Sequence, residues 1–280
     1  MTALPARLPR RAINGVLVLD KPVGPSSTQA LSAAKRLFGA LKAGHGGTLD
    51  PMASGILPVL FGEATKFAQQ GLDADKTYVA TVALGQETDT GDAEGQVVSR
   101  QAVCVTRAEL EQVLVAQLGS QDQKPPMYSA LKHQGRPLYE YARAGQTVDK
   151  PARQIHIHQI DLLSFDSPIA VIRVRCSKGT YIRVLAQTIG HQLGCGAHLA
   201  ALRRTGVGSL QIEQAISLEA LDAMALQDRE ACLLPVDALA GCHSPDKFRL
   251  YDTEQHFLGT GQVIDHRLWP ARLVAQPLFH

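Results

Sequence analysis

The sequence predicts an α+β fold built on a mixed, largely antiparallel sheet flanked by helices and loops. Strand and helix patterns are interspersed along the chain, but they do not follow the regular βαβ rhythm of a parallel sheet. Several strand candidates come in hairpin-like pairs. Hydrophobic residues make up 45% of the 280 residues and charged residues 19%, which is enough apolar material for a packed core.

The first elements are predicted from short local patterns. Residues 15–20, GVLVLD, form an apolar strand pattern that Lys21-Pro22 ends. A turn-rich stretch follows, and a helix is expected from about Ser27 to Phe38 because its apolar residues fall on one helical face. Residues 77–84, TYVATVAL, alternate as a half-buried strand does.

The middle of the chain predicts a helix, a strand pair and a second helix. Thr106 and Glu109 form a capping box that opens a helix through Leu118, with Gly119 closing it. Residues 155–163 and 169–176 are typical of two strands joined by the turn FDSP. A helix is expected from about Thr180 to Leu193.

Two segments differ in character from this core. The stretch 124–151 has weak core periodicity and predicts an exposed insertion of basic and aromatic residues: Lys124, Lys132, His133, Arg136, Arg143 and Lys150 with Tyr128, Tyr139 and Tyr141. After Pro235, strand patterns near residues 248–251 and 257–264 predict a small β-rich tail. We therefore expect a large domain over 1–237 and a small C-terminal domain over 238–280.

Composition excludes several classes of protein. No apolar run approaches the roughly 18 residues that a membrane-spanning helix needs. The N-terminus has an apolar run too short for a signal peptide and no small-residue cleavage site. Five cysteines, none in a C-x-x-C pair, argue against a disulfide framework or a cysteine zinc site. We expect a cytoplasmic protein.

The net charge of +2 is unevenly distributed along the chain. Residues 1–49 carry a net +6, residues 124–158 and 159–205 carry +4 each, and the segments 50–123 and 206–280 are acidic. Basic blocks of this kind can assemble into one positive face for a polyanion such as RNA. Ordinary solvated surface gives the same pattern, so charge alone does not decide.

Common catalytic signatures are absent from the sequence. There is no phosphate-binding loop, dinucleotide fingerprint, H-E-x-x-H motif or G-x-S-x-G elbow. His156 and His158 share one face of a predicted strand, but no carboxylate or cysteine stands near them in sequence to complete a metal site. We interpret them as surface or RNA-facing histidines and predict no metal.

One carboxylate stands out in residues 45–62, HGGTLDPMASGILPVLFG. Asp50 is the only Asp, Glu, Lys or Arg between Lys42 and Glu63, set among glycines and apolar residues. An Asp before a Pro is most often a turn residue or helix cap. The functional alternative is a single ionised carboxylate presented from a rigid loop, which can act as a nucleophile without a metal.

Two further segments carry candidate site residues. In CSKGTYIRVLAQTIG, residues 176–190, Arg183 lies in a first helical turn, where the helix dipole disfavours a cation. A partner carboxylate would offset this, and Asp50 is a candidate. Tyr78 begins a strand in which a core-supporting role is the ordinary interpretation.

Together these segments resemble one family. GVLVLDKPVGPSS (15–27), HGGTLDPMASGILPV (45–59), KTYVATVALGQETDTGDAEG (76–95), CSKGTYIRVLAQTIG (176–190) and HLAALRRTGVG (198–208) occur in order and at family spacing. Over about residues 12–237 the chain is similar to the bacterial TruB family, the tRNA pseudouridine-55 synthases. The resemblance favours functional roles for Asp50, Tyr78 and Arg183 over the ordinary interpretations.

The resemblance implies that the chain isomerises one T-loop uridine of tRNA to pseudouridine. Asp50 is then the catalytic nucleophile, acting on the sugar or aiding glycal formation, and Arg183 pairs with it. Tyr78 stacks on the flipped base and takes part in proton transfer. The remaining substrate-binding roles fall to His45, which fills the space left by flipped nucleotides, to Tyr181 and Leu202, which line the uracil pocket, and to Lys21, which supports the motif loop.

The resemblance also bears on partners and on the tail. It implies no cofactor, a tRNA T-arm as partner, no membrane, no obligate protein partner and a monomer. Residues 124–145 resemble the family's RNA-clamping insertion. The tail departs from the family: residues 248–274 resemble only the later half of its PUA-related domain, which leaves a shortened version of that domain.

Two rival classes stay open on the sequence. A tRNA-binding or folding chaperone with little catalysis fits the same scaffold, although retained Asp50, Tyr78 and Arg183 favour activity. A carboxylate-dependent hydrolase would need a second acid near Asp50, and no motif supplies one.

Overall fold

The computed structural model describes residues 10–129, 131–240 and 247–275. The outer ends of both predicted domains and Cys242 lie outside the described residues. The chain divides into two compact units, Met1–Ala74 with Arg204–His280 as unit 1 and Asp75–Arg203 as unit 2. This division follows contacts; the predicted boundary near residue 237 stays a prediction.

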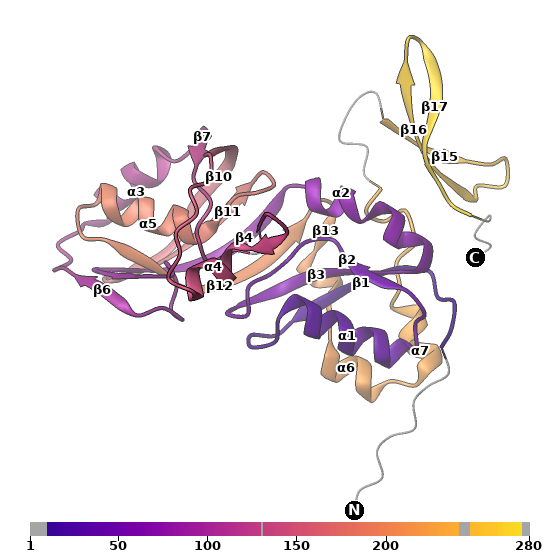
Figure 1. Cartoon of the computed structure of the whole chain (residues 1–280), viewed down its shortest axis with the longest axis horizontal. Coiled ribbons are helices and arrows are strands. Elements are labelled where there is room, and N and C mark those ends of the chain that lie inside the picture. The colour runs from indigo at the N-terminus through magenta and orange to yellow at the C-terminus, as the bar shows by residue number, and fades with distance from the viewer. Residues whose placement is uncertain (1–9, 130, 241–246, 276–280) are drawn as a thin grey trace, which may run out of the picture. The chain divides into compact units, whose positions relative to one another are not determined.

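Unit 1 combines the first quarter of the chain with its end (Figure 1). Its early elements are β1 (Gly15–Lys21), α1 (Ser27–Phe38), β2 (Ala43–His45), β3 (Ala53–Phe61), the 3-10 helix η1 (Gly62–Phe67) and α2 (Ala68–Asp73). Its late elements are β13 (Leu210–Gln211), η2 (Ile212–Gln214), β14 (Ile216–Ser217), α6 (Leu218–Ala223), α7 (Leu226–Ala231), β15 (Lys247–Tyr251), β16 (Phe257–Ile264) and β17 (Arg267–Leu273).

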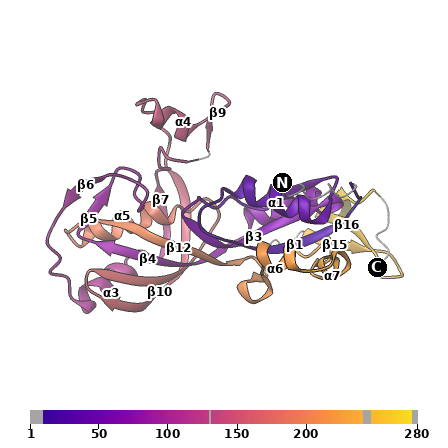
Figure 2. The ribbon, with the colours of Figure 1, turned by 90° about the horizontal axis from the view of Figure 1, so that it is seen from below.

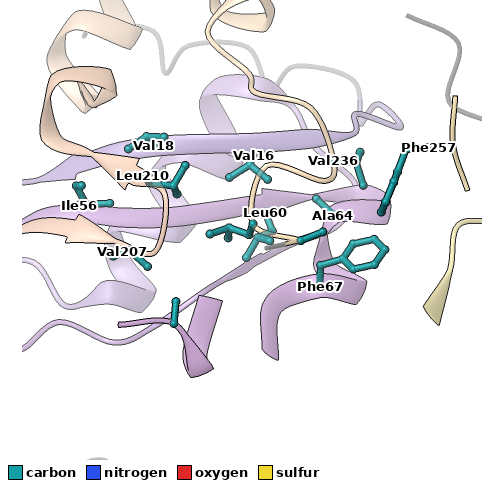
Figure 3. Packing of buried hydrophobic residues seen from close by; sticks show 13 residues of the cluster. Val16, Val18, Ile56, Leu60, Ala64, Phe67, Val207, Leu210, Val236 and Phe257 are labelled. Carbon is teal, nitrogen blue, oxygen red and sulfur yellow. The ribbon is translucent and has the colours of Figure 1, made fainter. Parts of the chain in front are cut away.

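Both faces of the β1–β3 pair are buried, which explains why these strands are almost continuously apolar. One face packs against α1 through Leu17, Leu57 and Phe61, with Phe38 stacked on Phe61 at 4.9 Å between ring centroids. Figure 3 shows the other face, where Val16, Val18, Ile56 and Leu60 pack toward η1 and the later strands.

The C-terminal strands form a separate antiparallel sheet in the order β15-β16-β17. This confirms the β-rich tail, and the structure adds β17, which the sequence analysis did not predict. Phe257 is buried against Phe67 with ring centroids 5.4 Å apart (Figure 3), and Tyr251 donates a hydrogen bond to Asp237 at 2.6 Å. The tail sheet therefore shares a core with η1.

Unit 2 holds the remaining elements: β4 (Lys76–Leu84), β5 (Gln86–Thr88), β6 (Val97–Arg100), α3 (Arg107–Val115), β7 (Gly119–Gln123), β8 (Lys132–His133), β9 (Arg136–Pro137), α4 (Leu138–Arg143), β10 (Arg153–Asp166), β11 (Ile169–Cys176) and α5 (Ile182–Gln192). β12 (Ala197–Val207) is divided between the units at Arg203 and Arg204.

The strand pairing confirms a mixed, mostly antiparallel sheet. In unit 1 the order is β14-β1-β3-β12, where β1 runs antiparallel to β3 and parallel to β14. In unit 2 the order is β12-β4-β11-β10-β7, and β4, β11, β10 and β7 are antiparallel in succession. Together with the flanking helices, this confirms the predicted α+β class.

Most predicted elements lie within two or three residues of their expected bounds. The predicted helix over 106–118 shows one of the larger differences, because α3 ends at Val115. The capping box of Thr106 and Glu109 is present, but Gly119 has a φ of 94° and opens β7 instead of capping the helix. Among the described residues, no helix is long and apolar enough to cross a membrane.

Candidate active site

Asp50 lies in the loop between β2 and β3, which we call the Asp50 loop (residues 46–52). The carboxylate residue is half-buried, and its main-chain oxygen accepts a hydrogen bond from Ala53 at 3.1 Å. The next residue, Pro51, accepts at its oxygen from the amide of Gly24 at 2.8 Å. The loop after β1 and the Asp50 loop are thus joined directly.

A buried serine holds the Asp50 loop from the side of α1. Ser27 is 2% exposed; its hydroxyl donates to the oxygen of Leu49 at 2.9 Å and accepts from the Leu49 amide at 2.8 Å. Ser27 is fixed in turn because α1 begins there, with the capping box of Ser26 and Gln29 setting the start of the helix. The residue before Asp50 is therefore tied to a rigid helix end.

Lys21 is fully buried at the end of β1. Its ammonium donates to the main-chain oxygens of Pro22 at 2.7 Å and Pro25 at 2.8 Å. The first and last carbonyls of the loop PVGP (22–25) therefore point toward the cation. This geometry fits the predicted loop-supporting role of Lys21, which stays a prediction.

His45 ends β2 and lies half-buried beside the Asp50 loop. Its Nδ1 atom is buried and has no hydrogen-bond partner among the described residues. Burial lowers the pKa of His45 below its usual value, and the positive charge of Arg204 lowers it further. The imidazole is consequently neutral at pH 7.

Arg204 is a functional candidate that the sequence analysis missed. The residue is 1% exposed, and it donates to three main-chain oxygens on both sides of the Asp50 loop. The available signal was the second arginine of RRTGVG in an otherwise core-like strand. A buried arginine needs acceptors, but the sequence does not show which ones.

Unit 2 carries Tyr78 and Arg183. Tyr78 is 8% exposed on the inward face of β4, where it pairs in register with Val174 of β11. Arg183 is 4% exposed in the first turn of α5. Its Nη1 atom donates to the oxygen of Thr90 at 3.1 Å, and its Nη2 atom donates to the oxygen of Tyr128 at 2.6 Å.

Arg183 also has a carboxylate partner that the sequence analysis missed. Asp92 lies 3.3 Å from Nη1, and both side chains are 5% exposed. Asp92 is oriented by Thr90, whose hydroxyl donates to it at 2.6 Å, and by the amide of Glu94 at 3.1 Å. The signal lay in the acid-rich turn DTGDAEG, but three carboxylates there compete for the assignment.

The last two predicted residues line other parts of unit 2. Tyr181 precedes α5, and its backbone is held by the Gln123 amide, with bonds of 2.7 Å and 3.1 Å. Leu202 is half-buried on β12. Unit 1 thus carries Lys21, His45 and Asp50, and unit 2 carries Tyr78, Tyr181, Arg183 and Leu202; the pairing of Asp50 with Arg183 stays a prediction.

The stretch 124–151 forms the hairpin β8–β9 and the short helix α4, which project from the rest of unit 2 (Figure 2). Arg136 lies over the ring of Tyr141 at 4.9 Å, and Arg143 lies over the ring of Tyr139 at 5.4 Å. These arginines are exposed, as are Lys124 and Lys132. The stretch has the basic and aromatic surface that its composition predicts.

His156 and His158 lie together on β10, with ring centroids 4.7 Å apart. His156 is 2.9 Å from the hydroxyl of Ser120, and His158 is 3.1 Å from Asp75, which also contacts Arg175. Across the described part of the chain, no group of three or more His, Cys, Asp or Glu side chains is arranged to hold a metal ion.

Comparison with family models defines the class first. Residues 35–182 match the N-terminal domain of the TruB family pseudouridylate synthases. Residues 183–240 match the C-terminal domain of tRNA pseudouridylate synthase B, and residues 235–274 match the C-terminal domain of pseudouridine synthase II TruB. The site therefore lies in a protein of the pseudouridylate synthase class.

Full-length relatives identify the family within that class. The chain is 61% identical over 238 residues to tRNA pseudouridine synthase B of Cupriavidus pinatubonensis, covering 84% of this chain and 76% of the relative. It is 57% identical over 294 residues to tRNA pseudouridine synthase B of Azoarcus sp. (strain BH72), covering 96% and 97%. The chain belongs to the TruB family.

The second alignment also bears on the length of the chain. Its 294 residues exceed the 280 residues of this chain, so the Azoarcus relative contains positions that have no counterpart here. This agrees with a chain that is shorter than its relatives.

Solved structures support the fold. The structure of a Cbf5–Nop10–Gar1 complex matches with a TM-score of 0.70 at 26% identity, covering 94% of this chain and 84% of that one. An H/ACA RNP bound to a substrate RNA containing 2′-deoxyuridine matches with a TM-score of 0.68 at 23% identity, covering 95% and 85%. At 23% identity, the second match supports the fold alone.

Proposed function

We propose that this chain is a tRNA pseudouridine(55) synthase, which isomerises the T-loop uridine to pseudouridine. The observation that carries the proposal is the match of Asp50 and its loop to the family motif, in a chain 50–61% identical over long stretches to relatives named tRNA pseudouridine synthase B. The anchoring of that loop by Ser27 and Arg204 supports a rigid presentation of the carboxylate.

The reaction rearranges atoms within one nucleotide. The bond between N1 of uracil and C1′ of ribose breaks, the base rotates, and C5 forms a bond to C1′. C5 loses its hydrogen as a proton and N1 gains one, so substrate and product have the same composition. Because no electrons or groups are exchanged with a second molecule, the reaction requires neither a redox cofactor nor a group donor.

Asp50 supplies the nucleophilic carboxylate in this proposal, either by attack on the sugar or by aiding glycal formation. Arg183 pairs with Asp50 and orients its carboxylate. Asp92 supports this role because its contact with Nη1 at 3.3 Å, beside the hydrogen bonds to Thr90 and Tyr128, fixes the plane of the Arg183 guanidinium.

The uridine must leave the base stack before its sugar can be attacked. Tyr78 stacks on the flipped base and serves in proton transfer, while Tyr181 and Leu202 form the wall of the uracil pocket. His45 fills the space that the flipped nucleotides vacate. Its neutral state supports this role, because moving an uncharged ring out of water and between bases has a smaller desolvation penalty than moving an imidazolium.

The partner in this proposal is the T-arm of tRNA, held through its phosphates. The exposed arginines and lysines of the stretch 124–151, with their adjacent tyrosines, supply a surface that can clamp RNA. We further propose a cytoplasmic monomer without an obligate protein partner, in which residues 238–280 form the shortened PUA-related domain.

The test is position-resolved detection of pseudouridine in a tRNA transcript and in a minimal T-arm hairpin. We expect one modified uridine, at position 55 of the tRNA and at the matching loop position of the hairpin. Affinity should fall steeply between about 50 and 200 mM salt as counterions are released. Tight binding with no modification would replace the proposal by the chaperone alternative.

A further inference from the structure

Arg204 places a full positive charge inside unit 1, where the only way to offset its lost hydration is to bind acceptors. Its Nε atom donates to the oxygen of Ile56 at 2.8 Å, Nη1 to that of Thr48 at 3.3 Å, and Nη2 to that of Gly47 at 3.3 Å. The guanidinium thus donates hydrogen bonds to three main-chain oxygens.

These three oxygens flank Asp50 on both sides. Gly47 and Thr48 precede the carboxylate within the Asp50 loop, and Ile56 follows it on β3. One rigid, planar group therefore ties the entry of the loop to its exit. A loop fixed at both ends presents its central side chain with little freedom.

The backbone around Arg204 is shaped to allow this contact. Gly55 has a φ of 99°, and a Cβ atom placed on it would lie 2.2 Å from the main-chain oxygen of Arg204. Only glycine permits this approach of β3 to β12. Ser27 holds the same loop through its two hydrogen bonds with Leu49.

We propose that Arg204, together with Ser27, is a positioning residue for catalysis: the pair holds the Asp50 loop so that the Asp50 carboxylate meets the reacting nucleotide in one geometry. This inference rests on the proposed function. Both side chains are almost fully buried and act through the main chain of residues 47–49 and 56. A displacement of about 1 Å in a reacting group can cost about a hundredfold in rate.

The same arginine has a second effect that is specific to this place in the fold. Its charge contributes to keeping His45 neutral, and His45 lies at the entry of the Asp50 loop.

The test compares Arg204→Lys with the matched control Arg229→Lys. Lysine keeps the charge but cannot bind three separated oxygens from one nitrogen. Arg229 lies in the same unit and also donates to two main-chain oxygens, those of Leu37 at 2.6 Å and Asp222 at 3.0 Å, but neither belongs to the Asp50 loop.

We expect Arg204→Lys to lower the single-turnover rate at saturating tRNA about a hundredfold, with the Kd for tRNA changed less than about threefold. Exchange of the Leu49 and Ala53 amides with solvent should accelerate in the same variant. Arg229→Lys should keep the rate within about twofold of wild type. A folded Arg204→Lys with the wild-type rate, or an equal rate loss in both variants, overturns the proposal.

Ser27→Ala keeps the proposal testable when Arg204→Lys does not fold. It removes both bonds to Leu49 and should lower the rate about tenfold with faster Leu49 exchange; an unchanged rate overturns the positioning role. A wild-type chain that leaves tRNA unmodified would instead refute the proposed function, and with it the catalytic consequence, while amide exchange would still report the anchoring.

Discussion

Arg183→Lys is the substitution that best separates a catalytic guanidinium from a generic cation. Arg183 is 4% exposed, and two different nitrogens of its guanidinium make contacts in unit 2. Nη1 binds the oxygen of Thr90 at 3.1 Å and Asp92 at 3.3 Å, and Nη2 binds the oxygen of Tyr128 at 2.6 Å. A lysine ammonium is a single point and cannot occupy both nitrogen positions.

The magnitude follows from those contacts. The variant loses at least one buried hydrogen bond to a charged donor, worth about 1.5–3 kcal/mol, and leaves its acceptor unpaired. We expect a loss of about 2 kcal/mol in the free energy of unfolding on this basis. The misplaced cation should also lower the single-turnover rate by about a hundredfold or more, which corresponds to about 2.7 kcal/mol in transition-state stabilisation.

The assay is the single-turnover rate at saturating tRNA, measured beside the Kd for the same RNA. The Kd should change less than about threefold, because the cation faces protein acceptors instead of phosphates. Arg175→Lys is the matched control: Arg175 lies in the same unit, but its contact with Asp75 is exposed, so it should leave the rate unchanged. A wild-type rate for Arg183→Lys at saturation would refute the reasoning.

Three further predictions follow from other groups. The pKa of His45 is lowered from 6.5, so the unfolded chain binds more protons at this residue than the folded chain as the pH falls through about 6.5. The free energy of unfolding should therefore drop in that window, and His45→Gln should reduce the drop. Identical pH profiles of stability for the wild type and the variant would contradict this. Burial raises the pKa of the Cys176 thiol to about 12, so alkylation at pH 8 should modify the exposed Cys104 and spare Cys176. Equal labelling of the two cysteines, measured by mass spectrometry, would contradict the raised pKa of Cys176. Gly55→Ala should cost about 3 kcal/mol in urea unfolding because of its positive φ and its 2.2 Å approach to Arg204; a loss below about 1 kcal/mol would contradict the clash.

Local sequence signals predicted the elements that depend on them. β1, α1, β4, the pair β10 and β11, and α5 each carry a complete hydrophobic pattern or cap within their own residues. β3 was missed because Gly55 and Pro58 interrupt its pattern, and a proline usually argues against a central strand. In the structure β2 ends at His45 opposite Val59, one residue short of Pro58.

Long-range contacts explain the rest of what the sequence did not show. Arg204 finds its acceptors about 150 positions earlier in the chain, and Arg183 finds Asp92 about 90 positions earlier. No spacing rule connects such pairs, so a buried arginine in β12 looks like any other arginine in the sequence. The motifs identified the family and the candidate residues, whereas the support around Asp50 became visible only in three dimensions.

Tritium release tests the central claim most directly. Joining C5 to C1′ expels the hydrogen on C5, so a tRNA transcript labelled with [5-³H]uridine releases tritium at the rate of the reaction. We predict stoichiometric release from one uridine with the wild-type chain and no release with Asp50→Asn, which keeps the shape of the side chain but loses its charge, while both bind tRNA with similar affinity. Release by Asp50→Asn at the wild-type rate would contradict the account.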